Sequence, residues 1–157
     1  MNPALTDAQI DQLVDAARAA RARAYAPYSH FAVGAALLDE QGRIHSGCNV
    51  ENAAYPQGLC AEAVALGLMV LAGGRRVLAA AVVGEAPQPV TPCGGCRQKL
   101  REFAADDMSI VSANGAAIVA RHTLGELLPA SFGPAHLSPL PPAGEGRGEG
   151  LADRAKP

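Results

Sequence analysis

The first half of the chain changes from a helical spacing of apolar residues to a strand spacing. Residues 6–23 open with a Thr-x-x-Gln capping-box pattern and then repeat apolar side chains three and four positions apart, which predicts a helix. Residues 30–38 are rich in Val, Ala and Leu, and an Asp-Glu-Gln-Gly turn leads from them into residues 43–48. This pattern predicts two strands joined as a hairpin. Residues 49–57 have no period and are predicted to form a loop.

The middle of the chain is more apolar. Residues 58–71 predict a mostly buried helix, with Gly73-Gly74 as its C-terminal cap. Residues 77–83 are a continuous apolar run, typical of a strand covered on both faces. Thr91-Pro92 predicts an N-cap followed by proline at the first helical position, so we expect a helix that runs to about residue 103.

Three short elements complete the expected fold. Residues 108–113 and 116–121 are strand patterns on either side of Asn114-Gly115, a dipeptide that favours a hairpin turn. Residues 124–128 are expected to form a short helical turn. The order of the elements predicts an α/β fold, with a central mixed five-stranded sheet inside a three-layer α/β/α arrangement.

Composition divides the chain into one domain and a tail. With 157 residues and 49% apolar residues, the chain is long and apolar enough for one core, which we place in residues 1–137. Residues 138–157 are rich in Pro and Gly and poor in apolar side chains, which predicts a disordered C-terminal tail.

The net charge and the cysteines limit the partners and the cellular compartment that we expect. The net charge is −2 and no long basic run occurs, so nucleic acid is not an expected partner. No apolar run reaches the ~20 residues that cross a bilayer, so no membrane contact is expected. Four cysteines without a secretory signal favour a reducing compartment, and we therefore expect a cytoplasmic protein.

Two short segments carry candidate metal chemistry. They are Cys60-Ala61-Glu62 and Pro92-Cys93-Gly94-Gly95-Cys96, both at predicted helix starts. A structural zinc site usually has four protein ligands, whereas a catalytic site has three and leaves the fourth position to water. Three cysteines with a glutamate close by therefore favour a catalytic zinc ion held by Cys60, Cys93 and Cys96. Glu62 would then lie close to the water on the metal.

Non-catalytic interpretations of these residues stay open at this point. Cys93 and Cys96 could be buried thiols or a redox pair, although Cys60-Ala61-Glu62 would then be a coincidence. Glu62 could be a solvated helix residue, but its helix is otherwise almost wholly apolar. If Cys48 were a fourth ligand, the site would be closed, and the protein would be a non-enzymatic structural zinc module.

Beyond the metal motif, several segments resemble one known family. Cys-Ala-Glu followed by Pro-Cys-Gly-Gly-Cys-Arg-Gln resembles the zinc-dependent cytidine deaminases of the small homotetrameric type. Residues 25–37 resemble the first strand segment of that family, residues 47–55 its ribose-binding segment and residues 127–133 its C-terminal element. The likeness covers nearly all of residues 6–137.

The resemblance implies a reaction. It is the hydrolytic deamination of cytidine and deoxycytidine to uridine and deoxyuridine plus ammonia, in pyrimidine salvage. One Zn²⁺ per subunit would carry the hydroxide that attacks C4. Glu62 would shuttle the proton, and the backbone N–H of Cys93 would help to hold the attacking oxygen.

The resemblance also assigns the remaining site. Asn49 and Glu51 would bind the ribose, and alternation along an extended segment would point both side chains the same way. Phe31 and Ala61 would lie against the nucleoside.

Two aromatic residues connect this site to the expected homotetramer. Phe132 would reach a neighbouring subunit's site, and Tyr55 would lie near a subunit boundary and contact the substrate.

One departure from the family concerns charge. Ala63 stands where many three-cysteine members have arginine, whose charge offsets the three thiolates. Arg97 is the nearby residue that we expect to take over this compensation.

A deaminase of another cytosine-like compound, such as the blasticidin class, is the enzyme alternative, but Asn49 and Glu51 argue against it. Balanced charge and ribose-binding residues also argue against a deaminase that edits RNA or DNA.

Overall fold

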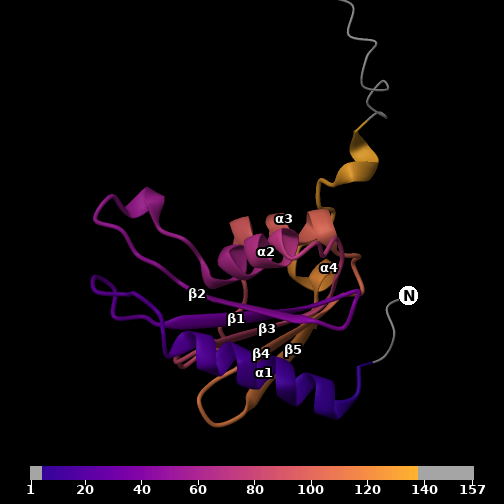
Figure 1. The fold of residues 1–157 in the computed structure, drawn as a ribbon. Coiled ribbons are helices and arrows are strands. Elements are labelled where there is room, and N and C mark those ends of the chain that lie inside the picture. Colours follow the sequence, from indigo (N-terminus) through magenta and orange to yellow (C-terminus); the bar gives the residue numbers. More distant parts are fainter. Residues whose placement is uncertain (1–4, 138–157) are drawn as a thin grey trace, which may run out of the picture.

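A sheet divides the molecule into two helical layers (Figure 1). The computed structural model describes residues 5–137. In chain order its elements are α1 (Asp7–Arg21), β1 (Val33–Asp39), β2 (Ile44–Cys48), η1 (Tyr55–Gln57), α2 (Ala61–Leu71), β3 (Val77–Gly84), α3 (Gly94–Phe103), β4 (Ser109–Ala113), β5 (Ile118–Thr123), α4 (Leu124–Leu127) and η2 (Pro134–His136).

The sheet formed by these described residues is mixed. Its five strands lie in the order β2-β1-β3-β4-β5. The β1 strand pairs antiparallel with both β2 and β3, β3 pairs parallel with β4, and β4 pairs antiparallel with β5. Figure 1 shows α1 on one face of the sheet and α2 and α3 on the other. The predicted three-layer α/β/α architecture with a mixed five-stranded sheet is therefore confirmed.

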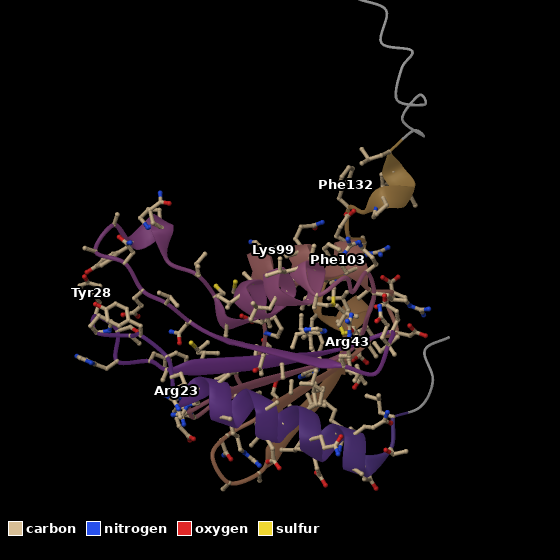
Figure 2. The ribbon with its side chains drawn as sticks, viewed as in Figure 1. Arg23, Tyr28, Arg43, Lys99, Phe103 and Phe132 are labelled. Carbon is tan, nitrogen blue, oxygen red and sulfur yellow. The ribbon has the colours of Figure 1, made fainter. Side chains whose placement is uncertain are left out.

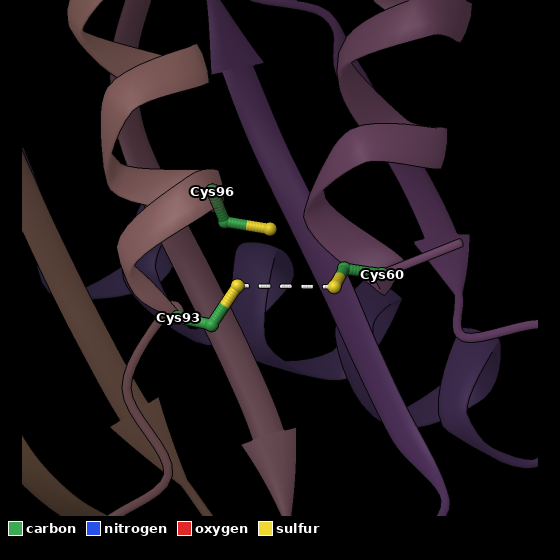
Figure 3. Close-up of side chains that lie close together, drawn as sticks. All are labelled: Cys60, Cys93 and Cys96. Carbon is green, nitrogen blue, oxygen red and sulfur yellow. Dashed lines mark hydrogen bonds between the residues drawn. The ribbon is translucent and has the colours of Figure 1, made fainter. Parts of the chain in front are cut away.

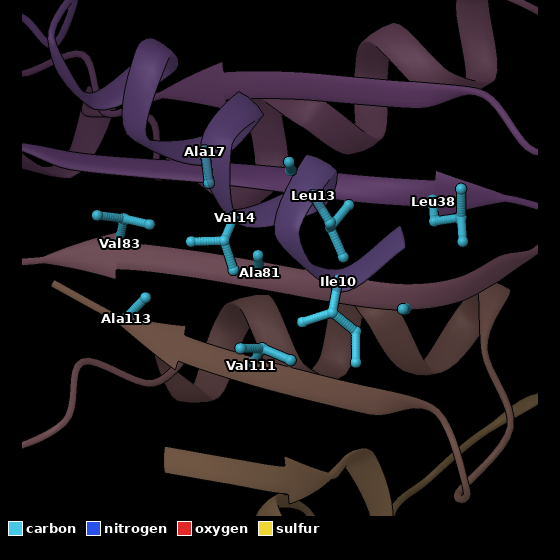
Figure 4. Packing of buried hydrophobic residues seen from close by; sticks show 11 residues of the cluster. Ile10, Leu13, Val14, Ala17, Leu38, Ala81, Val83, Val111 and Ala113 are labelled. Atoms are coloured by element: carbon cyan, nitrogen blue, oxygen red, sulfur yellow. The ribbon is translucent and has the colours of Figure 1, made fainter. Parts of the chain in front are cut away.

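Helix α1 supplies one of the two main cores. Thr6 and Gln9 form the expected capping box, and the buried side chains of α1 pack on β1, β3 and β4 (Figure 4). Close packing requires Gly34 on β1, because a Cβ atom there would lie 2.0 Å from the Ala17 carbonyl oxygen. The helix thus rests directly on the strand backbone.

The core on the opposite face of the sheet fixes the position of the first turn of α2. Leu66 and Met69 of α2 pack with Leu100 of α3 and with strand side chains on this face. Gly47 on β2 allows α2 to approach, because a Cβ atom there would lie 2.6 Å from the Ala61 carbonyl oxygen. Ala61 itself packs on β1 and β3, so the first turn of α2 lies over the centre of the sheet.

Several boundaries differ from the sequence prediction. The helix expected to begin at Thr91-Pro92 begins instead at Gly94, with Cys93 as its N-cap in extended conformation. Arg97 explains the difference, because its side chain donates to the Pro92 carbonyl and the Thr91 hydroxyl and holds both outside the helix. The helix expected over residues 58–71 begins at Ala61.

The first strand, β1, begins at Val33 and not at the predicted residue 30; His30 has a left-handed φ of 57°, which is not strand geometry. The predicted tail, residues 138–157, lies outside the described residues. None of the helices within residues 5–137 has the length and apolar character needed to cross a membrane.

Candidate active site

Two helix starts meet on one side of the sheet and bring three thiols together. Cys60 is the N-cap of α2 and Cys93 is the N-cap of α3. Their Sγ atoms are 3.9 Å apart, and those of Cys60, Cys93 and Cys96 all lie within 4.8 Å of one another (Figure 3). The predicted metal ligands form one cluster in space, although Cys60 lies 33 positions before Cys93 in the sequence.

The donor atoms of this cluster fit zinc. Zinc–sulfur bonds of about 2.3 Å in a tetrahedron place neighbouring sulfur atoms about 3.8 Å apart. The separation between Cys60 and Cys93 is close to this value. Among the described residues, Cys48 is not part of the cluster; it ends β2 and is half-buried. The alternative of a site closed by Cys48 therefore finds no support in this geometry, and three cysteine ligands leave one tetrahedral position for another ligand.

The three thiols differ in acidity because they differ in surroundings. Burial raises the pKa of Cys60, and the neighbouring Cys93 charge adds to this effect. Burial also opposes ionisation of Cys93, but hydrogen bonds from the backbone and side chain of Cys96 outweigh it and lower the pKa of Cys93. Cys96 is buried, and burial together with the charge of Glu62 raises its pKa strongly. Cys93 is thus the thiol that most readily becomes a thiolate.

Glu62 lies beside the thiols with little contact to water. Its exposed fraction is 5%, although it lies in the first turn of α2. Burial raises the pKa of its carboxyl above the ordinary range. The Cys96 thiol donates to Glu62 Oε2 over 3.4 Å. A carboxyl with a raised pKa next to a metal site has the properties of a general acid and base.

A cavity of about 380 Å³ opens above this centre. Its size is within the range of small-molecule sites, roughly 300–1,000 Å³. It contains most of the predicted site residues together with several apolar ones: Phe31, Val33, Asn49, Val50, Glu51, Tyr55, Gly58, Leu59, Cys60, Ala61, Glu62, Val90, Thr91 and Cys93.

Asn49 and Glu51 both hold the loop that carries Phe31. Asn49 Nδ2 donates to the Phe31 carbonyl over 2.9 Å, and its Oδ1 accepts from the Val33 N–H over 2.8 Å. Glu51 accepts hydrogen bonds from the backbone of Tyr28 and from the backbone and hydroxyl of Ser29. The two residues predicted to bind ribose therefore also shape the wall of the cavity.

Two of the predicted site residues lie elsewhere. Figure 2 shows Phe132 on the segment after α4, at the opposite end of the molecule from Tyr28. The residue is 58% exposed, and its ring stacks on the ring of His136, with ring centroids 5.2 Å apart. The guanidinium of Arg97 contacts the carbonyls of Pro92 and Leu127 and the Thr91 hydroxyl. This chain alone brings neither Phe132 nor Arg97 into its cavity.

Sequence reasoning missed part of the cavity wall. Leu59, Val90 and Thr91 line it, although no motif distinguishes them. Their proximity along the chain to Cys60 and Cys93 was the available signal. Ser29 was missed as well, and only its hydrogen bonds to Glu51 and Phe31 reveal its position in the site.

A three-thiol centre with room for a further ligand, beside a buried carboxyl at two helix starts, is the arrangement of a zinc-dependent hydrolytic enzyme. Comparison with known proteins identifies the family. Residues 7–112 match the family model described as the cytidine and deoxycytidylate deaminase zinc-binding region. The chain belongs to the cytidine deaminase family and is an enzyme of it, with zinc as the cofactor that the cluster is positioned to bind.

Individual relatives support this assignment over most of the chain. The cytidine deaminase of Sporosarcina psychrophila is 43% identical over 129 residues, which are 82% of this chain and 95% of that protein. The crystal structure of the cytidine deaminase from Burkholderia pseudomallei matches with a TM-score of 0.75 and 45% identity, covering 82% of this chain and all of that chain. The crystal structure from Mycobacterium tuberculosis gives a TM-score of 0.69 at 41% identity, covering 82% and 99% of the two chains.

Proposed function

We propose that this protein deaminates cytidine and deoxycytidine by hydrolysis, giving uridine or deoxyuridine and ammonia. The observation that carries the proposal is the shared cavity. The thiols of Cys60 and Cys93 and the carboxyl of Glu62 face the same cavity as Asn49 and Glu51. The same cavity thus offers hydrolytic chemistry and hydrogen-bonding groups suited to a sugar.

The reaction replaces the C4 amino group by oxygen. Water adds at C4, the C4–N bond breaks, and ammonia leaves with the two amino protons and one proton from the water, while the other water proton ends on N3. When bound, zinc activates the water that this hydrolysis consumes.

Glu62 moves the protons in this scheme. It takes one from the water, delivers it to N3 of the pyrimidine and then assists the departure of ammonia. Burial raises the pKa of the Glu62 carboxyl, which makes it a stronger proton acceptor than a carboxylate in water. The backbone N–H of Cys93, at the start of α3, donates to the oxygen that adds to C4.

The cavity wall suits a pyrimidine nucleoside. Phe31, Leu59 and Val90 provide apolar surface for the flat base. Asn49 and Glu51 provide an amide and a carboxylate that hydrogen-bond to sugar hydroxyls. These two residues favour a nucleoside over a blasticidin-type compound that lacks a ribose.

We extend the proposal to a homotetramer with sites shared between subunits. Helix α2 carries no charged residue except the buried Glu62, yet Leu68 is exposed and Leu71 is 83% exposed. A helix that is apolar on its exposed side is expected to be covered. Tyr55 and Phe132 are exposed aromatic residues that a second subunit would bury.

The proposal places the enzyme in the cytoplasm, in the salvage of free pyrimidine nucleosides. All four cysteines are unpaired, which suits a reducing compartment.

Ammonia release from cytidine by zinc-loaded protein tests the proposal, with Glu62→Gln measured alongside. We expect release by the wild type and almost none by the variant. Release from blasticidin S but not from cytidine would replace the proposed substrate. If the zinc-loaded wild type released no ammonia from either compound, the proposed reaction would be contradicted.

A further inference from the structure

Ser29 lies between two groups that the proposed function assigns to the substrate. Its hydroxyl donates to Glu51 Oε1 and accepts a hydrogen bond from the Phe31 N–H over 3.0 Å. A serine hydroxyl has one proton to donate and can accept as well, and both capacities are used here. The sugar-facing carboxylate and the base-facing aromatic residue are thus joined through one side chain.

The carboxylate of Glu51 is held on both oxygens. Oε1 receives the Ser29 hydroxyl, and Oε2 receives the backbone N–H groups of Tyr28 and Ser29 over 2.8 and 3.2 Å. The hydrogen bond from the Ser29 hydroxyl, with those backbone bonds, outweighs desolvation and lowers the pKa of Glu51. An ionised carboxylate has about four lone-pair positions, so it can accept a sugar hydroxyl while these bonds persist.

The backbone between Ser29 and Phe31 gives the bridge a second purpose. His30 has a φ of 57°, a left-handed conformation that non-glycine residues adopt only when their surroundings enforce it. The bond from the Phe31 N–H to the Ser29 hydroxyl spans this residue. Asn49 holds the same turn through the Phe31 carbonyl and the Val33 N–H, so loss of the Ser29 hydroxyl would act mainly on the carboxylate.

We infer that Ser29 is a positioning residue for sugar recognition, which fixes the Glu51 carboxylate toward the ribose hydroxyls and ties it to the loop of Phe31. The inference rests on the proposed function, because it gives Glu51 a ribose to bind. Ser29 touches no reacting atom, so it acts on how well the sugar is held rather than on the chemical step.

The test compares a nucleoside with an analogue whose sugar lacks the 2′ and 3′ hydroxyls but keeps the 5′ hydroxyl. KM for cytidine and the inhibition constant of 2′,3′-dideoxycytidine are measured for wild type and Ser29→Ala. Because Ser29 acts on the sugar only through Glu51, the loss of one ordinary hydrogen bond predicts a rise in the KM for cytidine of roughly five- to tenfold. We expect kcat and the inhibition constant of the dideoxy analogue to stay within about twofold of the wild type.

A double-mutant cycle separates this role from a general effect on the fold. If Ser29 acts through Glu51, Ser29→Ala adds no further rise in KM on a Glu51→Gln background. Ser29→Thr retains the hydroxyl and should restore most of the affinity for cytidine. Ser109→Ala, which removes a half-buried serine hydroxyl on β4 outside the cavity, is the matched control and should change neither constant.

Three outcomes would overturn the inference. They are an equal weakening of both nucleosides in Ser29→Ala, an unchanged KM for cytidine, or a full additional loss on the Glu51→Gln background. A wild-type protein that neither converts cytidine nor binds it would instead refute the proposed function, and the inference with it.

Discussion

The Cys96 thiol donates a hydrogen bond to Oε2 of Glu62, and so the buried end of the thiol cluster is joined to the buried carboxyl. A thiol that binds zinc gives up its proton and can no longer donate. Metal binding would therefore free this carboxyl oxygen for a hydrogen bond to water. Zinc loading and the availability of Glu62 are linked through one sulfur atom.

The first prediction concerns Glu62. An amide has nearly the shape of the carboxyl but cannot accept the proton, so we expect Glu62→Gln to lower kcat by roughly a hundred- to ten-thousandfold. Zinc content, measured by metal analysis, should stay near one ion per chain. Glu102→Gln, an exposed change on α3, should leave kcat unaltered. A Glu62→Gln enzyme with more than a tenth of wild-type activity would remove Glu62 from the chemistry.

After zinc is removed, the three thiols should react with an alkylating reagent in a fixed order. Cys93 is exposed and has a lowered pKa, Cys60 is exposed with a raised pKa, and Cys96 is buried with its pKa raised most. Thiolate is the reactive form. Iodoacetamide added after chelation should therefore modify Cys93 first and Cys96 last, as followed by peptide mass spectrometry. Zinc-loaded protein is the control, in which all three should be protected. Early modification of Cys96 would contradict the described environment.

Gly47 should be intolerant of a side chain. A Cβ atom there would lie 2.6 Å from backbone atoms of Ala61 and Ala65, so Gly47→Ala must displace the start of α2. We expect a loss of about 1–3 kcal/mol in the free energy of unfolding in urea, together with weaker zinc binding. Gly67→Ala is the matched control, because nothing lies within 4 Å of a Cβ atom at Gly67. Equal effects of the two changes would contradict the close approach of α2 and β2.

Asp39 should make the stability of the fold depend on pH in the acidic range. Burial alone would raise its pKa, but hydrogen bonds from His45 and Arg43 outweigh burial and lower the pKa from 3.8 to about 2. A carboxyl whose pKa is lower in the folded state stabilises the fold above its unfolded pKa and loses this effect as the pH falls toward the folded value. The shift corresponds to about 2 kcal/mol, lost between about pH 5 and pH 2.

Urea unfolding at several pH values measures this contribution. We expect the free energy of unfolding of Asp39→Asn to be lower near pH 6 and to change less than that of the wild type between pH 5 and pH 2. Asp15→Asn, at an exposed position on α1, serves as the comparison. Parallel acid profiles for the wild type and Asp39→Asn would refute the assignment.

Replacement of Ser112 by alanine should not lower the stability of the fold. Its side chain is fully buried on β4, and its hydroxyl has no hydrogen-bond partner among the described residues. Because an unpaired buried hydroxyl costs free energy, we expect Ser112→Ala to be neutral or to stabilise the protein by up to about 1 kcal/mol. Thermal unfolding measures the change. A marked fall in the melting temperature would show that the hydroxyl has a partner after all.

The sequence predicted the sheet and the metal ligands because both depend on local patterns. Apolar period marked the strands, and the spacing of Cys93 and Cys96 placed two ligands on one helical turn. The junctions were less predictable. Thr91 has the residue type of an N-cap, but the long-range contacts of Arg97 hold it outside the helix.

The roles of polar residues in the cavity were only partly predictable for a similar reason. Alternation predicted that Asn49 and Glu51 would face the same region, and both line the cavity. Their hydrogen bonds to residues 28–33 depend on how a loop folds back across the strand end, which no local period records. Phe132 does not line the cavity of this chain, and its expected role in a neighbouring subunit's site stays a prediction.

Placing ligands at helix N-caps makes the centre sensitive to helix length. Cys60 and Cys93 each occupy the last extended residue before a helix. An α-helix turns by about 100° per residue, so starting either helix one residue earlier would swing its sulfur away from the other two. Substitutions that strengthen helix formation ahead of either cysteine could thus silence the enzyme while leaving every ligand in the sequence.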